Sequence, residues 1–263
     1  MSGNSAFVLV TERTWRRGLG NLLSNELARW WKTRLWWIQC LIWGGLVGFL
    51  LGSILAQAPE TPLSEMVMAY SIFGGMMPAV AVVIIMQDVV VGEKQEGTAA
   101  WVLSKPVSRP AFILSKFIAN ALGVLVTMVL FPGVIAYGVF AFGAGVSIDA
   151  GRFIGALGIA YLALLYALTL TLMLGALFQS RGAVIGIGLA FVFGQQFLVG
   201  LAPFLKYVVT WTMVISNTPG ETAIMPAVLL GDAPWSWIPV LTVAAQIPVF
   251  LWIALRSFER EEF

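Results

Sequence analysis

Few side chains in this 263-residue sequence could perform acid–base, nucleophilic or metal chemistry. The chain has no histidine, the commonest metal ligand and general base. Its one cysteine, Cys40, lies in an apolar run, so neither an internal disulfide nor a thiolate metal site is available. No nucleophile is clustered with a base. We therefore expect no catalytic residue, no metal site and no cofactor bound by this chain.

Polar side chains are concentrated in one long stretch of the first half of the chain, residues 92–110. Gly97-Thr98 can end one helix and begin another, with Thr98 as the N-cap, and Pro106 can end this second helix. Ser108-Arg109-Pro110 is typical of a further helix start. The pattern predicts a short helix with the apolar centre Trp101-Val102-Leu103 and the charged flanks Glu93, Glu96, Lys105 and Arg109.

The composition around this stretch indicates an integral membrane protein. The chain is 59% hydrophobic and 11% charged, whereas about a quarter of the residues of a soluble domain are charged. The net charge of +2 is too small to indicate nucleic-acid binding. A bilayer core requires about 20 apolar residues per helix. We predict an all-α protein with six transmembrane helices at 35–56, 66–86, 117–142, 153–178, 183–205 and 237–255.

The basic residues predict the orientation of these spans. Thirteen of the 15 lie before the first span, between the second and third, after the fourth or after the sixth, which leaves Arg152 and Lys206 for the other side. Lys and Arg are retained on the cytoplasmic face. We therefore predict a plasma-membrane protein with both termini in the cytoplasm, divided into a leader at 1–34, a membrane domain at 35–255 and a tail at 256–263.

Two segments outside the spans have helical patterns. The leader between Leu19 and Lys32 has an apolar face and a polar face, which predicts an amphipathic helix on the cytoplasmic leaflet, with tryptophans at headgroup level and cations on anionic lipid. The outer loop 206–236 contains two apolar pieces too short to span. We expect one or two short interfacial or re-entrant helices there, with an ordered loop as an equal alternative.

The spans themselves contain no carboxylate, and their most central polar residues are the amides of Gln195 and Gln196. Adjacent helical side chains point about 100° apart, so at most one of the two can face a common cavity. Hydrogen bonding between helices is favoured over contact with a substrate. Gly44, Gly48 and Gly52 form a ridge of small residues, which predicts close helix packing within the chain or against another subunit.

One family resemblance emerges from the polar stretch. The run Glu93-x-x-Glu96-Gly97-Thr98 is followed by Leu103-Ser104-x-Pro106-Val107-Ser108-Arg109 and by Lys116 at the entrance to an apolar helix. This order resembles the cytoplasmic-loop signature of type-2 ABC transporter permeases. The six spans, the amphipathic leader and the long last outer loop are also similar to the compact branch of that family. Trp101 departs from the pattern, which has an aliphatic or small residue at this position.

The resemblance implies a permease that pairs with a second copy or a homologous permease and sits on two cytoplasmic ABC ATPase subunits. ATP and Mg are expected in those partners, because this sequence has no Gly-x-x-x-x-Gly-Lys-Ser/Thr phosphate loop. The implied activity is export of a hydrophobic or amphipathic substrate, with Gln195 and Gln196 as candidates for its pathway. The implied coupling contacts are Glu93, Glu96, Gly97, Thr98, Trp101, Leu103, Pro106 and Arg109.

Two other classes of protein remain open. An ion-coupled secondary carrier is disfavoured because the spans lack mid-membrane charge and an evident internal repeat. A membrane-embedded enzyme or assembly factor that needs no ATPase is disfavoured because no reactive groups cluster at one depth. For the stretch 92–110, a solvated loop is the simpler alternative, but it does not explain the apolar centre Trp101-Val102-Leu103.

Overall fold

The computed structural model describes residues 15–57, 63–215 and 221–261, which form helices and their connections without a β-strand. Six helical rods are long and apolar enough to cross a membrane. They are Leu35–Gln57, Leu63–Gln95, Arg109–Gly143, Ala150–Leu177, Arg181–Leu201 and Ile238–Glu259. The all-α prediction with six spans is confirmed, and the chain is a multi-pass membrane protein.

The first half of the chain forms a leader helix and three spans. The α-helices are α1 at Leu19–Trp31, α2 at Leu35–Gln57, α3 at Leu63–Tyr70, α4 at Pro78–Gln95, α5 at Thr98–Leu103, α6 at Arg109–Val124 and α7 at Phe131–Gly138. Three π-helical turns extend or join them: η1 at Ser71–Met76, η2 at Leu125–Leu130 and η3 at Val139–Gly143. Thus α3, η1 and α4 form the second span, and α6, η2, α7 and η3 form the third.

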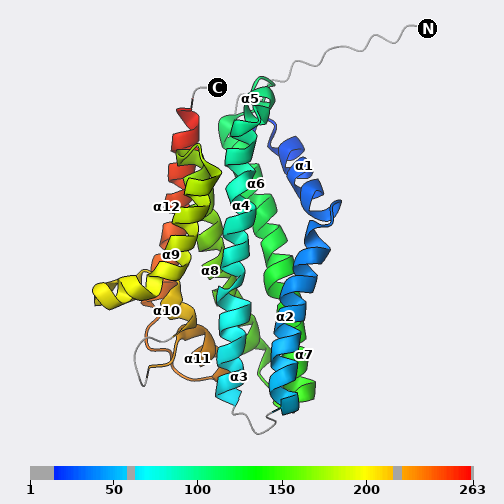
Figure 1. Cartoon of the computed structure of the whole chain (residues 1–263), viewed down its shortest axis with the longest axis vertical. Coiled ribbons are helices and arrows are strands. Elements are labelled where there is room, and N and C mark those ends of the chain that lie inside the picture. Colours follow the sequence, from blue (N-terminus) through cyan, green and yellow to red (C-terminus); the bar gives the residue numbers. More distant parts are fainter. Residues whose placement is uncertain (1–14, 58–62, 216–220, 262–263) are drawn as a thin grey trace, which may run out of the picture.

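The second half forms three more spans and the short helices between the last two. The spans are α8 at Ala150–Leu177, α9 at Arg181–Leu201 and α12 at Ile238–Glu259. The short pieces are the 3₁₀ turn η4 at Pro203–Tyr207, α10 at Trp211–Val214 and α11 at Ile224–Leu230. Figure 1 shows α5 and the C-terminal end of α12 at one end of the bundle, and α3 and α11 toward the other. We call these the α5 end and the α11 end.

The π-helical turns η1 and η2 lie just before prolines. Pro78 and Pro132 have no N–H to donate to the carbonyl four residues earlier. The turns before them widen instead, so that Met77 N–H donates to Ile72 O at 2.9 Å, five residues back. Proline therefore accounts for the position of these turns without ending either span.

Helix α8 is the centre of the packing. It lies against α4, α9, α11 and α12, and most of its length is buried. One apolar cluster fills the α11 end, where the rings of Tyr70 and Phe153 stack with centroids 5.9 Å apart. A second cluster fills the α5 end, where Phe112 of α6 stacks on Phe258 of α12 at 4.9 Å. Met77, Leu157 and Met173 pack against both clusters, so the apolar interior is continuous along the bundle.

The second and third spans are longer than the sequence predicts. Their 33 and 35 residues correspond to rods of about 50 Å, more than a hydrocarbon core requires. The predicted membrane spans 66–86 and 117–142 lie within these rods, because α4 continues to Gln95 and α6 already begins at Arg109. Charged residues in these extensions pair with neighbouring helices.

Helix α1 packs along α6 through its last turn. Trp30 is 1% exposed, and its indole N–H donates to Asn120 Oδ1 at 3.0 Å. The ring lies over Gly123, where an added Cβ would come within 2.3 Å of it. The prediction of a headgroup position is therefore wrong for Trp30, because α6 supplies both a gap and a hydrogen-bond partner. Trp31, on an adjacent face, is 39% exposed.

Candidate functional site at the α5 end

The connection between the second and third spans is built by backbone geometry at its two ends. Gly97 has φ of 71°, in the left-handed region that favours glycine, and this conformation ends α4. Thr98 is then the first helical residue of α5, so its prediction as the N-cap is wrong by one position. At the other end, Ser108 caps α6 by accepting a hydrogen bond from Ala111 N–H at 3.2 Å.

Helix α5 has an inner and an outer face. Ala99 is fully buried, and Val102 and Leu103 pack partly into the apolar cluster of the α5 end. Trp101 points outward with 62% exposure, and Lys105 Nζ lies 3.5 Å from its ring centroid. A large exposed aromatic ring beside a cation is a common anchor for a protein partner.

A buried lysine joins three helices beneath α5. Lys116 Nζ of α6 lies 2.6 Å from Glu26 Oε1 of α1 and 2.5 Å from Glu93 Oε1 of α4. The lysine side chain is 1% exposed, so both ion pairs are largely shielded from water. Removing one member of such a cluster leaves an unpaired buried charge. Lys116 therefore fixes the positions of α1, α4 and α6 relative to one another.

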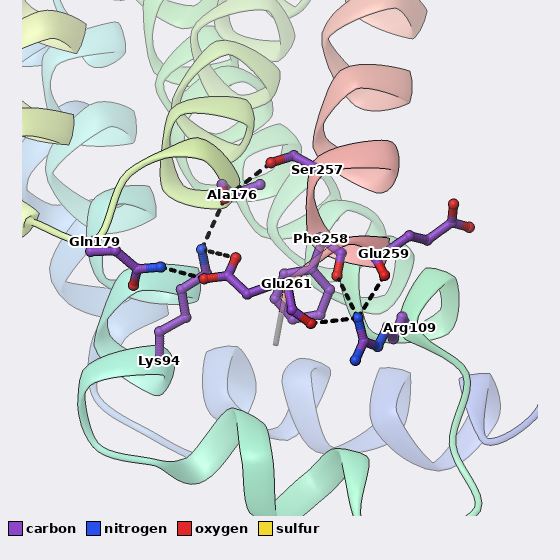
Figure 2. A network of polar contacts seen from close by, with 8 residues as sticks. All are labelled: Lys94, Arg109, Ala176, Gln179, Ser257, Phe258, Glu259 and Glu261. Atoms are coloured by element: carbon purple, nitrogen blue, oxygen red, sulfur yellow. Dashed lines mark hydrogen bonds and ion pairs between the residues drawn. The ribbon is translucent and has the colours of Figure 1, made fainter. Parts of the chain in front are cut away.

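A second group of polar contacts joins the C-terminal end of α12 to the rest of the bundle (Figure 2). Arg109 Nη1 donates to the carbonyls of Phe258, Glu259 and Glu261, at 3.3, 2.6 and 2.6 Å. Because the last carbonyls of a helix have no partner within the helix, Arg109 serves as a side-chain cap for α12.

Lys94 completes this second group from the opposite side. Its ammonium lies 2.5 Å from Glu261 Oε2 and donates to Ala176 O at 2.9 Å. Gln179 donates to the other carboxylate oxygen of Glu261. Figure 2 shows these side chains converging between the ends of α4, α8 and α12. The end of α12 is therefore held by both α4 and α6.

Helix α9 is joined to the same region through its first residue. Arg181 Nη2 lies 3.0 Å from Asp88 Oδ1 and 3.2 Å from Glu96 Oε1, both at the end of the second span. Gln95 also donates to Gln179 O at 2.8 Å, just before α9. These side chains are substantially exposed, so the ion pairs are weaker than those of Lys116.

The segment before α1 is attached to the connection itself. Ser108 N–H donates to Arg17 O at 3.1 Å, and its hydroxyl donates to Trp15 O. Gly18 has φ of 78° and lies against Val107, which leaves no room for a Cβ. Hydrogen bonds and close packing therefore fix the segment before α1 to this connection.

The structure divides the predicted coupling residues into two groups. Glu96, Gly97, Thr98, Trp101 and Pro106 are exposed, whereas Leu103 is partly buried. Glu93 and Arg109 instead contact Lys116 and the end of α12, so their side chains are committed within the chain. The sequence signals for these internal roles were weak, because a charge at the end of a span also fits a simple membrane border.

Reasoning from the sequence missed several residues that build this end. Glu26 and Glu261 were assigned no role, and Lys94 and Lys116 were interpreted as border charges and, for Lys116, as part of the family signature. One usable signal was that Glu26 is the only acidic residue in the sequence of α1. The contacts themselves join residues as many as 152 positions apart, as for Arg109 and Glu261.

The two central amides lie on different sides of α9. Gln195 is 2% exposed, and its Oε1 accepts from Thr210 Oγ1 at 3.0 Å and from Trp211 N–H at 2.8 Å. Gln196 is exposed on the outer surface. The interpretation of hydrogen bonding holds for Gln195, which joins α9 to the segment beginning α10. A void of about 10 Å³ beside Gln195 has room for one water molecule and none for a substrate.

The three glycines of the predicted ridge also differ in their surroundings. A Cβ on Gly44 would come within 2.5 Å of Phe131, and one on Gly48 within 3.1 Å of Ile135, so these glycines pack α2 onto the third span. Gly52 has no such neighbour within 4 Å among the described residues. The ridge therefore serves packing within the chain at two of its three positions.

Comparison with known proteins places these features in a family. A family described as "Protein of unknown function (DUF2705)" matches residues 37–263. No curated protein matches the chain. The matched region contains all the spans except the first two residues of α2, and it includes α5, Lys94, Arg109 and Lys116. Since the match extends over most of its length, the chain belongs to the DUF2705 family.

Proposed function

We propose that this protein is the permease subunit of an ATP-driven ABC transporter, an exporter of a hydrophobic or amphipathic substrate. A separate ATPase would dock on α5 and bind the ATP and Mg. The observation that carries the proposal is the arrangement of α5: a short helix with Trp101 exposed outward and Ala99 fixed inward. An apolar anchor on a supported helix suits the groove of a partner, whereas a solvated loop needs neither feature.

The contacts behind α5 support its role in coupling. Glu93 reaches α1 and α6 through Lys116, and Glu96 reaches α9 through Arg181. Arg109, which follows the connection, holds the end of α12. A push on α5 would therefore act on four other helices through short polar contacts. Packed helices with such contacts move as units rather than deforming continuously.

The proposed orientation places the α5 end in the cytoplasm of a plasma-membrane protein. Support comes from the charge distribution, because the cations Lys94, Lys105 and Arg109 lie at the α5 end. Arg152 and Lys206 lie beside the outer segments that contain α10 and α11. Both termini would then be cytoplasmic, and α10 and α11 would cap the outer side of the bundle.

The proposed pathway runs between two permeases rather than through one. The void beside Gln195 is too small for a substrate. The Gln196 amide is exposed on the surface of a membrane-spanning helix. A hydrogen-bonding partner there would lower the free-energy cost of placing the amide in lipid. A second copy or a homologous permease could supply such a partner. Gln196 is then a better candidate for the pathway than Gln195.

The proposal is tested by reconstituting the chain with a candidate ABC ATPase that copurifies with it. We expect stimulated ATP turnover and ATP-dependent transport in liposomes. Trp101→Ala should abolish most of the stimulation while leaving insertion and thermal stability unchanged, because the ring is exposed. Trp237→Ala is the matched control. Trp237 is also an exposed tryptophan, at 52%, but it directly precedes α12 and is not part of α5.

Two results would contradict the proposal. Transport by the chain alone, without ATP, would favour an ion-coupled carrier. Unchanged ATP turnover in a complex carrying Trp101→Ala together with Gly97→Pro would exclude α5 as the coupling element. A Gly97→Pro substitution is informative because proline cannot adopt the φ of 71° observed at this position.

A further inference from the structure

A second polar surface lies near the α5 end, between α8 and α12. A groove of about 400 Å³ runs between the end of α8 and the last turns of α12. It is lined by Leu177, Trp252, Ile253, Arg256, Ser257 and Arg260. We call it the α8–α12 groove. None of these residues belongs to the proposed ATPase-docking face on α5.

The side chains of the α8–α12 groove are ordered along the helix axis. Trp252, Arg256 and Arg260 are four residues apart, so they lie on one face of α12. The tryptophan is 61% exposed, and both arginines are exposed as well. The apolar part of the groove, with Leu177 at 48% exposure, is therefore followed by a cationic part toward the helix end.

This order matches the border between hydrocarbon and headgroups. Residues 238–255 of α12 contain no charged side chain, and Arg256 is the first charge after them. Eighteen residues correspond to about 27 Å of helix, close to the thickness of the hydrocarbon core. The guanidinium groups therefore lie at headgroup level, and Trp252 lies one turn deeper, beside acyl chains.

The two arginines are available to an anion. Arg256 Nη1 is 3.6 Å from Glu259 Oε2, an exposed pair whose attraction is weak. Glu261, another acid near this helix end, is held by Lys94. Among the residues that the structure describes, no carboxylate pairs with Arg260. The Ser257 hydroxyl donates to Ala176 O at 3.4 Å and so joins the groove floor to α8.

We propose that the α8–α12 groove binds the headgroup phosphate of an anionic phospholipid, with one acyl chain along Leu177 and Trp252. Two guanidinium groups supply fork-shaped donors that match phosphate oxygens. The apolar part distinguishes a lipid from free phosphate, which would leave Trp252 uncovered. Anionic lipid is concentrated in the cytoplasmic leaflet, where the charge pattern puts this end of the bundle. The site does not depend on an ATPase or on a transported substrate.

Quenching of Trp252 by brominated lipid tests the site directly. The full chain is placed in nanodiscs that contain phosphatidylglycerol or phosphatidylcholine with brominated acyl chains. For the unaltered chain and for each variant, the fluorescence of Trp252 is the difference between the protein with Trp252 and the same protein carrying Trp252→Phe. We expect quenching at a lipid fraction roughly tenfold lower for phosphatidylglycerol than for phosphatidylcholine.

Variants test whether the preference for anionic lipid depends on Arg256 and Arg260 or on surface charge in general. Arg256→Gln with Arg260→Gln should remove the preference, and Arg256→Lys with Arg260→Lys should restore part of it. Arg29→Gln with Lys32→Gln removes the same charge from exposed positions near α1, and this control should keep the preference at Trp252.

Three outcomes would overturn the assignment. Equal quenching of the unaltered chain by both lipids would mean that the groove does not select an anionic headgroup. A preference that survives the double glutamine variant would place the selectivity elsewhere. Inorganic phosphate that abolishes the preference, where chloride of equal ionic strength does not, would identify a site for free phosphate rather than for a lipid.

Discussion

Lys116 Nζ lies 2.5 Å from Glu93 Oε1, although these residues come from different spans and the lysine side chain is 1% exposed. The same ammonium contacts Glu26 of the leader helix at 2.6 Å. One positive charge thus holds two carboxylates that would otherwise repel each other. This contact joins the two rods on either side of α5.

Replacing Lys116 should therefore destabilise the fold strongly. Lys116→Met leaves Glu26 and Glu93 as unpaired neighbouring charges, and we expect the free energy of unfolding in mixed micelles to fall by about 3 kcal/mol. Lys105→Met is the control, because Lys105 is exposed and contacts one ring; a loss of about 0.5 kcal/mol is expected there.

A compensating variant makes the Lys116 prediction specific. Adding Glu26→Gln and Glu93→Gln to Lys116→Met removes all three charges, so stability should partly recover. Absence of recovery would show that the methionine side chain, rather than unpaired charge, causes the loss.

Gly123 should be intolerant of even the smallest side chain. Gly123→Ala would bring its Cβ within 2.3 Å of the Trp30 ring. We expect α1 to separate from α6 and the free energy of unfolding to fall by about 2 kcal/mol. Disulfide crosslinking between cysteines introduced in α1 and α6 would report the separation.

Gly138→Ala provides the matched control for Gly123. Gly138 is also helical, but no atom lies within 4 Å of its added Cβ among the described residues. Because alanine is the better helix former by about 1 kcal/mol, Gly138→Ala should be neutral or stabilising. Equal losses at the two glycines would contradict the packing of Trp30 on α6.

Arg109 should protect the last turn of α12. Arg109→Gln loses charge-assisted hydrogen bonds to the carbonyls of Phe258, Glu259 and Glu261. We expect the opening free energy of this turn to fall by about 2 kcal/mol. Hydrogen exchange of the amides at 256–261 measures the change. Arg256→Gln removes a charge from the same turn without removing a cap, and unchanged exchange is expected for it.

The adjacent amides of α9 should differ sharply in their effects. Gln195→Leu removes the acceptor for Trp211 N–H and Thr210 Oγ1, so exchange at the Trp211 amide should accelerate, at a cost of about 2 kcal/mol. Gln196→Leu changes an exposed side chain and should alter the stability of the isolated chain by less than about 0.5 kcal/mol. The reverse order would contradict the described orientation of α9.

The sequence by itself determined the class of the protein and the number of its spans. Six apolar runs of sufficient length force helices in a bilayer, because backbone groups there need partners within their own segment. It also located the break at Gly97 and the helix start before Pro110, since these depend on local backbone preferences. Each of these inferences needed only residues a few positions apart.

The tertiary structure alone decided which charges are internal. Glu93 and Glu96 have the same charge and are three residues apart, yet Glu93 meets the buried Lys116, whereas Glu96 is largely exposed beside Arg181. Gln195 and Gln196 are likewise separated into an interior and a surface residue. Local pattern cannot make this distinction, because the free energy of a charge or amide depends on partners brought close by packing from distant parts of the chain.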